Sequence, residues 1–476
     1  MKVLFPVSEV APIVKLGGLG DVAGSLPKAL QKLNVDVDVI VPFYTVIDRG
    51  QYKIIKQYSL EVPYAGKTHK VDVYKTKLPG SLVDVLLLKN TEYFDKGGTN
   101  AFSSLKDEVE RFSFFDRAVV EYIKASFNIY DLVHCQDWHT GVITHLLEEE
   151  IGEERPATLF TIHNVAYQGQ WGLELVQELG LSIPLHKILQ WDLEDGNINF
   201  MLEGIASSDA VSTVSPAYAK ELLSPDVGGQ MADILKGKES RFFGILNGID
   251  VDSFNPSTDK FLIKRFDKDS WKDKKKENKH ALQKELGLEV RDCMVFSLVS
   301  RLDPKQKGLD LLWEILPKLL ALDAQVVILG KGEKAYEEKL VALSKVKKYH
   351  GKLSISVGFD EGLARRIYAS SDAFLMPSRT EPCGLSQMIA MRYGTLPIVH
   401  AVGGLKDTVK DGTDGFSFTV FSANALIRTV ERAYKLKNSK KWDQMVKNAI
   451  NKDFSWDKSA KEYKDLYQKV ISYRKG

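Results

Sequence analysis

The chain has 476 residues, 44% hydrophobic and 27% charged, and its 65 Lys and Arg nearly cancel its 63 Asp and Glu. This balance excludes a disordered chain, and the net charge of +2 gives no overall sign of nucleic-acid binding. An odd set of 3 cysteines is no disulfide framework, so we expect a reducing compartment, the cytoplasm. We find neither an apolar run long enough to cross a membrane nor a signal-peptide pattern.

Short β-branched runs alternate with helical patterns along the chain. A first series of predicted strands covers 2–7, 36–41, 83–88, 131–134, 157–162 and 210–214, with a helix over 24–33. A second series covers 293–299, 325–330, 353–357, 373–376 and 396–399. Strands that alternate with helices form parallel sheets with right-handed crossovers. The two series therefore predict two doubly wound α/β domains.

Turn signals mark the expected domain boundary, because Asn-Gly and Asn-Pro pairs stand at either end of 247–256. We expect domains over 1–248 and 249–455. The remaining 456–476 should form an amphipathic helix that packs back on the N-terminal domain. The lysine-rich segment 264–285 is expected to be a solvated linker that runs into an amphipathic helix, rather than a polyanion-binding patch.

Ligands of open parallel sheets bind beyond the carboxyl ends of the strands, so we expect a site in the cleft between the domains. The first candidate is the glycine-rich stretch 15–21 (KLGGLGD), where backbone N–H groups and a helix start could approach a phosphate. Its glycines also come close to a dinucleotide fingerprint, which leaves an NAD(P)-dependent dehydrogenase as an alternative. About ten residues separate the glycines from the strand, however, and no Walker A loop is present.

Two polar clusters follow strands of the first domain. In 134–140 (HCQDWHT), the residues Asp137, Trp138 and His139 could line a cleft or bind a sugar, while Cys135 fits a small core residue. A metal site is an alternative, but no second Cys/His pair lies close in sequence. His163 ends the next strand, where it could be structural or functional.

Two further clusters follow strands of the second domain. In 301–308 (RLDPKQKG), a guanidinium and an ammonium suit a diphosphate, although surface ion pairing would use the same residues. In 378–386 (SRTEPCGLS), backbone N–H groups could hold phosphate or sugar oxygens. Glu381 could accept sugar hydroxyls or could merely cap the helix. Together these clusters indicate a nucleotide-sugar site.

At the level of whole motifs, the sequence resembles bacterial glycogen synthases and plant starch synthases. The motifs that carry this resemblance span almost the whole chain: KLGGLGDVAGSLPKAL, QDWHTG, FTIHNVAYQG, GILNGIDVDSFNP, RLDPKQKGLDLL and SRTEPCGLSQMIAMRYGTLPIV. The resemblance implies the GT-B fold, two Rossmann-like domains around a deep cleft. It further implies a retaining transfer of glucose from ADP-glucose to the non-reducing end of an α-1,4-glucan, without cofactor or metal. UDP-glucose is an alternative donor.

The resemblance also implies roles for individual residues. Lys15, Gly17, Gly18 and Asp21 would lie along the phosphates, and Arg301 and Lys307 would stabilise the departing diphosphate. The glucosyl group would be held by Asp137, His163, Asn247 and Glu381, helped by the backbone of Cys383, Gly384, Leu385 and Ser386. Tyr93 and Trp138 would shape the acceptor side, and Phe359 would lie against the base.

One segment departs from the family pattern. Leu202 and Glu203 stand where the family often has a lysine and a small residue, which puts one local interaction in doubt. Two other classes of protein fit the sequence less well. A non-catalytic glucan-binding protein would not need Arg301 and Lys307 at strand ends, and a phosphorylase would need a lysine that carries pyridoxal phosphate.

Overall fold

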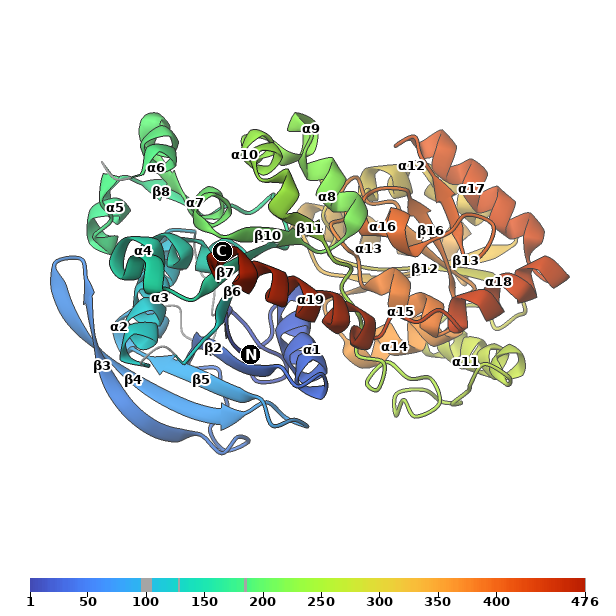
Figure 1. The fold of residues 1–476 in the computed structure, drawn as a ribbon. Coiled ribbons are helices and arrows are strands. Elements are labelled where there is room, and N and C mark those ends of the chain that lie inside the picture. Colours follow the sequence, from blue (N-terminus) through green and yellow to red (C-terminus); the bar gives the residue numbers. More distant parts are fainter. Residues whose placement is uncertain (96–104, 127–128, 184–185, 476) are drawn as a thin grey trace. The chain divides into compact units, whose positions relative to one another are not determined.

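The computed structural model describes residues 1–95, 105–126, 129–183 and 186–475. The chain divides into two compact units. In Figure 1 the first is coloured blue to green, with a dark red C-terminal helix, and the second yellow-green to orange-red. Unit 1 comprises Met1–Gly248 together with Trp456–Gly476, and unit 2 comprises Ile249–Ser455. Each unit is built on its own mainly parallel β-sheet with helices, which confirms the predicted α/β class.

The sheet of unit 1 has the order β11-β10-β7-β6-β1-β2-β5-β4-β3 among the described residues. Its strands are β1 (Lys2–Pro6), β2 (Asp36–Pro42), β3 (Ile55–Tyr64), β4 (Lys67–Lys77), β5 (Asp84–Lys89), β6 (Leu132–Gln136), β7 (Ala157–Ile162), β10 (Ala210–Thr213) and β11 (Phe242–Gly244). The strands predicted from β-branched runs are buried on both faces and pair in parallel. A small antiparallel pair, β8 (Gln170–Gly172) and β9 (Asn197–Asn199), stands apart.

The antiparallel hairpin β3–β4 was not predicted. It extends the sheet beyond β5, and its turn places Ala65 and Gly66 at φ 51° and 71°. The two strands expose many side chains and bury others in alternation, unlike the fully buried β5. The sequence signal was this period-2 alternation, which is typical of a sheet with one solvated face.

The helices of unit 1 connect the strands. They are α1 (Gly18–Lys32), α2 (Thr91–Phe94), α3 (Leu105–Ala125), α4 (Gly141–Ile151), α5 (Glu174–Leu179), α6 (Lys187–Asp192), α7 (Phe200–Ser207), α8 (Pro216–Leu222), α9 (Pro225–Gly228), α10 (Met231–Gly237) and α19 (Trp456–Lys475). Helix α1 begins at Gly18, six residues before the predicted start, so the glycine-rich stretch supplies its first turn. The C-terminal helix α19 packs against α1 and β7. Its buried Tyr467 hydroxyl lies 2.8 Å from Nδ1 of His134 on β6.

In unit 2 the strands pair in parallel in the order β14-β13-β12-β15-β16-β17 among the described residues. They are β12 (Met294–Val299), β13 (Ala324–Gly330), β14 (Leu353–Val357), β15 (Ala373–Met376), β16 (Leu396–His400) and β17 (Phe416–Phe418). The helices are α11 (Trp271–Glu285), α12 (Leu309–Ala321), α13 (Lys334–Ser344), α14 (Glu361–Ser370), α15 (Ser386–Arg392), α16 (Gly403–Thr408), α17 (Ala423–Leu436) and α18 (Lys440–Ile450). This is the Rossmann order, whose direction reverses between β12 and β15. In unit 1 the direction reverses between β1 and β6.

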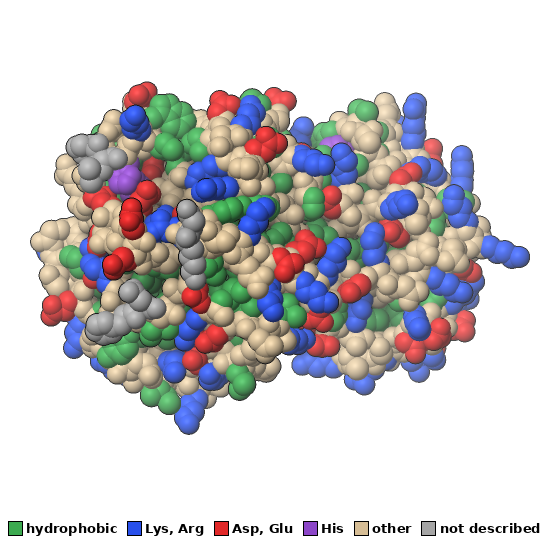
Figure 2. Space-filling model, in the orientation of Figure 1, with side chains coloured by type: hydrophobic (Ala, Val, Ile, Leu, Met, Phe, Trp, Pro, Cys, Tyr) green, Lys and Arg blue, Asp and Glu red, His purple; other side chains and the backbone are tan. Residues whose placement is uncertain are grey.

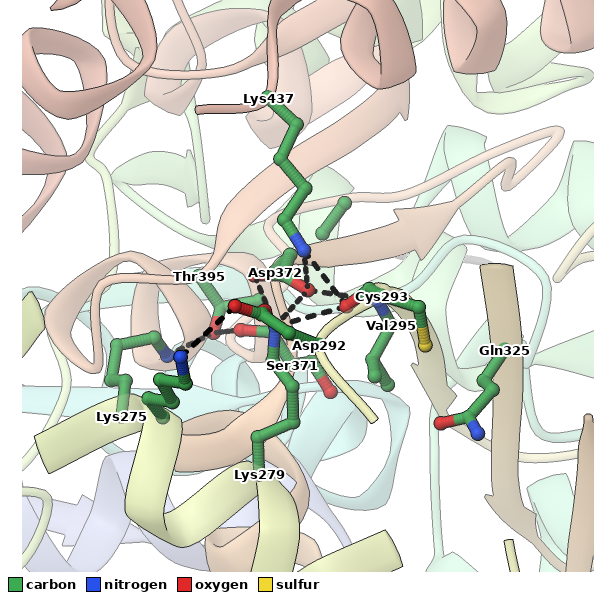
Figure 3. Close-up of polar contacts among 12 residues, drawn as sticks. Lys275, Lys279, Asp292, Cys293, Val295, Gln325, Ser371, Asp372, Thr395 and Lys437 are labelled. Carbon is green, nitrogen blue, oxygen red and sulfur yellow. Dashed lines mark hydrogen bonds and ion pairs between the residues drawn. The ribbon is translucent and has the colours of Figure 1, made fainter. Parts of the chain in front are cut away.

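The prediction of a solvated lysine-rich segment is wrong for two lysines of α11. Lys279 contacts Asp372 through Nζ at 2.7 and 2.9 Å, and Lys437 contacts the same carboxylate at 3.1 Å (Figure 3). Lys275 is also buried, and its Nζ donates to the carbonyl oxygens of Ala369 and Tyr393. Interspersed Glu and Asp suggested a solvated face, but the Asp372 carboxylate and the carbonyls of Ala369 and Tyr393 lie 93 to 118 residues further along the chain than the lysines that contact them.

Charged side chains of both signs are interspersed on the surface that Figure 2 shows, in keeping with the small net charge. In the part of the chain that the structure describes, no helix is both long and apolar enough to span a bilayer.

Candidate functional site

The loop after β1 is organised by Glu9, a residue that sequence reasoning missed. Its buried carboxylate accepts hydrogen bonds from the backbone N–H of Leu16 and, at 2.9 Å, of Gly17. Burial raises the pKa of Glu9, and these N–H bonds oppose the rise. A Cβ on Gly20 would come within 2.8 Å of Glu9 Oε2, so a larger residue there would displace this carboxylate. The signal was an acidic residue three positions after a buried strand.

This arrangement already uses one of the backbone N–H groups that were predicted to bind phosphate. The N–H of Gly17 is bonded to Glu9, whereas Gly18 begins α1 and lies in its first turn. Lys15 and Asp21 form an ion pair on the surface of the loop, with Nζ 2.6 Å from Oδ1. The structure therefore places Lys15, Gly18 and Asp21 together at the start of α1, where helix N–H groups favour an anion.

Asp137 and His163 meet where β6 and β7 end. Asp137 has a φ of 62°, and its carboxylate accepts the Trp138 N–H at 2.9 Å. Burial raises the pKa of Asp137 to about 7, while N–H bonds from Trp138, Asn164 and His163 lower it. Its own N–H donates to the Thr161 carbonyl at 2.9 Å, which ties the two strand ends together.

His163 is oriented by Gln136, whose Oε1 lies 2.8 Å from the imidazole Nε2. An amide oxygen only accepts, so Nε2 carries the proton and Nδ1 of the neutral ring is an acceptor. Burial lowers the pKa of His163 to about 3, which keeps the ring neutral near neutral pH. A neutral imidazole at a strand end can accept a hydrogen bond from a substrate hydroxyl.

Asn247 belongs to the same unit and is buried. Among the residues that the structure describes, its Oδ1 has no hydrogen-bond partner. A buried acceptor without a partner is costly, so a ligand hydroxyl would be a suitable donor for it.

Tyr93 and Trp138, by contrast, are core aromatic residues. The ring of Tyr93 stacks on Phe114 at 4.0 Å between centroids, and burial raises its pKa to about 12. Trp138 stacks on His139 at 4.1 Å and is 3% exposed. The structure does not bring either ring to the surface, so any influence on an acceptor would be indirect.

Lys307 and Glu381 form the central pair of unit 2. Nζ of Lys307 lies 3.0 and 2.8 Å from the two carboxylate oxygens of Glu381, and the Ser378 hydroxyl donates to the same carboxylate at 2.8 Å. Lys307 follows β12 and Glu381 follows β15, the two strands at which the sheet order reverses. Open α/β sheets bind ligands at this place.

The backbone explains why the pair meets. Gly308 has a φ of 65°, and a Cβ there would lie 2.0 Å from the Pro377 carbonyl oxygen, so glycine lets the two loops touch. The N–H of Arg379 donates to the Gln306 carbonyl at 2.8 Å and fastens the loops together. Arg301 is exposed beside them and donates from Nη2 to the Gln306 Oε1 at 2.9 Å.

The remaining predicted residues of unit 2 lie in the segment between β15 and α15 and in the loop after β14. Cys383 is buried, Gly384 has a φ of 72°, and α15 begins at Ser386 with Leu385 as its N-cap residue. Phe359 lies after β14 and is 85% exposed, so its ring is open to stack on a ligand. None of these predicted residues belongs to a potential metal cluster. Within the described ranges, such a cluster is formed by His145, Glu149 and His186.

Comparisons with known proteins cover the chain from end to end. Residues 2–237 match the starch synthase catalytic domain, and residues 278–452 match glycosyl transferases group 1. The chain is 42% identical to a glycogen synthase of Kosmotoga olearia, covering 99% of this chain and 98% of that protein. It is 41% identical to a glycogen synthase of Desulforudis audaxviator, covering 99% and 97%.

Among solved structures, the catalytic domain of starch synthase IV from Arabidopsis thaliana, bound to ADP and acarbose, matches with a TM-score of 0.91. It is 33% identical, and the match covers 99% of both chains. These matches confirm the resemblance and the GT-B fold that it implied. The chain belongs to the glycogen and starch synthase family.

Proposed function

We propose that this protein is a retaining glucosyltransferase that moves glucose from ADP-glucose to the non-reducing end of an α-1,4-glucan. The observation that carries the proposal is the Lys307–Glu381 pair, which stands beside Arg301 at the switch point of unit 2. The family to which the chain belongs and the ADP and acarbose bound to its relative support a nucleotide sugar and a glucan as substrates.

Breaking the bond between glucose and the diphosphate puts positive charge on the sugar and negative charge on the leaving oxygen. We assign Arg301 and Lys307 to that oxygen, because cations there stabilise the transition state more than the ground state. Lys307 is already oriented by two contacts with Glu381, so little reorganisation is needed when the diphosphate departs. Lys15, Gly18 and Asp21 would lie along the phosphates in unit 1.

The glucosyl group would be held by Asp137, His163, Asn247 and Glu381. Retention often uses a carboxylate nucleophile. Here the Glu381 carboxylate is occupied by Lys307 and Ser378, and Asp137 accepts the Trp138 N–H. These contacts favour attack by the acceptor hydroxyl on the same face from which the diphosphate leaves. The new bond joins the acceptor oxygen to the anomeric carbon, and the hydroxyl proton passes to the leaving phosphate oxygen.

We also propose that the reaction needs no metal ion, because Arg301 and Lys307 supply the positive charge that a metal would provide. A chelator should then leave the rate unchanged. A cytoplasmic location is supported by the three cysteines, which are buried and free. Cell fractionation would test it.

Nucleotide release in the presence of glycogen tests the proposed function, with ADP-glucose and UDP-glucose as parallel donors. We expect glycogen-dependent ADP release that Lys15→Ala abolishes. Lys32→Ala is the matched control, because Lys32 is an exposed lysine in the last turn of α1, at the other end of the helix that Lys15 precedes. Preference for UDP-glucose would retain the mechanism and correct the donor. No release from either donor would contradict the proposal.

A further inference from the structure

A second cluster of chemically active side chains lies in unit 1, apart from the residues assigned to glucosyl transfer. His145 and Glu149 stand one turn apart on α4, and His186 directly precedes α6. One potential ligand atom from each lies within 4.8 Å of those from the other two. Positions i and i+4 share one helix face, so α4 presents an imidazole and a carboxylate side by side.

The imidazoles in this cluster are incompletely satisfied. His145 is fully buried, yet its Nε2 has no hydrogen-bond partner among the described residues. Nε2 of His186 is in the same position, because its 3.7 Å distance from Glu149 Oε2 exceeds a hydrogen bond. The rings of His145 and His186 lie 3.9 Å apart between centroids. Unpartnered buried nitrogens are rare and ask for an explanation.

Glu203 on α7 orients the buried histidine. Its carboxylate oxygen lies 2.7 Å from Nδ1 of His145, and both side chains are 1% exposed. A carboxylate that accepts from one imidazole nitrogen turns the other nitrogen toward a metal ion, the usual outer-shell arrangement of protein metal sites. Glu203 also departs from the family pattern in the sequence, and this contact gives that departure a local role.

We propose that His145, His186 and Glu149 form a binding site for a divalent transition metal, Zn²⁺ by ligand type, with Glu203 as the residue that positions His145. Two imidazoles and a carboxylate suit Zn²⁺, and a water molecule would complete a tetrahedron. Bonds of about 2.0–2.1 Å require ligand atoms roughly 3.3 Å apart. The three side chains therefore need only a modest inward movement from the present geometry.

The exposure of the cluster fits this assignment. The side chains of Glu149 and His186 are 15% and 17% exposed, so an ion can enter from the solvent side. Figure 2 shows histidine surface beside acidic side chains where α5 and α6 lie. The bound ion would fasten the start of α6 to α4.

Zinc binding to the full chain tests the proposal independently of glucosyl transfer. After chelator treatment, the protein is titrated with Zn²⁺ against a chromophoric competitor, and Co²⁺ reports the coordination geometry by its absorption. We expect one Zn²⁺ per chain, a tetrahedral Co²⁺ spectrum and a higher melting temperature with Zn²⁺. His186→Ala should abolish all three, while nucleotide release in the absence of metal stays at the wild-type level.

His350→Ala is the matched control, because His350 is an exposed histidine of unit 2 and should leave zinc binding intact. Replacing the buried His145 could unfold the chain, so Glu203→Gln tests the positioning role instead. It keeps an acceptor for Nδ1 and should weaken zinc binding about 10- to 100-fold. Absence of stoichiometric binding, or equal binding by wild type and His186→Ala, would overturn the proposal.

Discussion

Strands β12 and β15 carry a buried lysine–carboxylate group at each end, and the two groups differ in their surroundings. At the amino ends, the Asp372 carboxylate accepts hydrogen bonds from the ammonium groups of Lys279 and Lys437 and from the Val295 N–H. Burial alone would raise the pKa of Asp372, but the charges of the two lysines lower it. At the carboxyl ends, the Glu381 carboxylate accepts hydrogen bonds from one lysine, Lys307, and from the Ser378 hydroxyl.

The comparison teaches that a buried ion pair is not by itself a sign of function. Such pairs contribute little net stability, although removing one partner is costly. What separates the two groups is the end of the sheet at which they stand, because ligands bind beyond the carboxyl ends. The Asp372 group should therefore support folding, and the Lys307 group should support catalysis.

The largest effect is expected at the structural end. Asp372→Asn leaves two buried lysines without their carboxylate and should lower the free energy of unfolding by about 3–5 kcal/mol. The kcat of the folded fraction should stay at the wild-type level. Urea unfolding measures the first and initial rates the second. Asp292→Asn is the control, because that side chain is 58% exposed beside Lys276 and its loss should cost less than about 1 kcal/mol.

The opposite pattern is expected at the carboxyl ends. Lys307→Met should lower kcat by about 10²–10³-fold, the usual consequence of losing one group that stabilises transition-state charge. Its effect on unfolding should be smaller than that of Asp372→Asn, and Lys305→Met should change neither quantity. A Lys307→Met enzyme with wild-type kcat would contradict the catalytic role that we assign to the ion pair at the carboxyl ends of β12 and β15.

A third buried group lies at the carboxyl ends of the strands of unit 1, where burial keeps the His163 imidazole neutral. It extends the comparison from ion pairs to a group without charge. The pKa of His163 is lowered to about 3, below its value near 6.5 in the unfolded chain. Between these values the unfolded state binds more protons, so stability rises as the pH increases through this window. From pH 7 to 4, wild type should lose about 3 kcal/mol more than His163→Gln. Parallel urea titrations of the two proteins would show whether the curves diverge.

The smallest effect is expected for the exposed pair Lys15–Asp21, whose side chains are 42% and 35% exposed. Asp21→Asn should change the free energy of unfolding by less than about 1 kcal/mol, because water screens such pairs. A larger loss in urea unfolding would show that exposure is a poor guide to which ion pairs support the fold.

The sequence predicted the parallel strands well, because runs such as 373–376 and 396–399 are buried on both faces and form continuous apolar stretches in the sequence. The β3–β4 hairpin was missed, since its alternating exposure lacks such a run. Lys275 and Lys279 were misjudged, because their partners are distant in sequence and no local pattern reports them.

The candidate site shows the same limit. The positions of His163 and Lys307 after predicted strands indicated that they belong to the site. The sequence spacing could not show that the N–H of Gly17 is hydrogen-bonded to Glu9. Nor could it show that Trp138 is enclosed by His139 and by the close approach of Gly169. These contacts depend on how loops pack against each other, which a single sequence does not encode as a local pattern.

The most direct test of the proposed glucosyl transfer is NMR of the reaction between ADP-glucose labelled with ¹³C at the anomeric carbon and a maltooligosaccharide acceptor. The mechanism predicts that the label moves into a new α-1,4 linkage at the non-reducing end, with ADP as the second product. A β-linked product, or labelled free glucose as the main product in the presence of acceptor, would contradict a retaining glucosyltransferase.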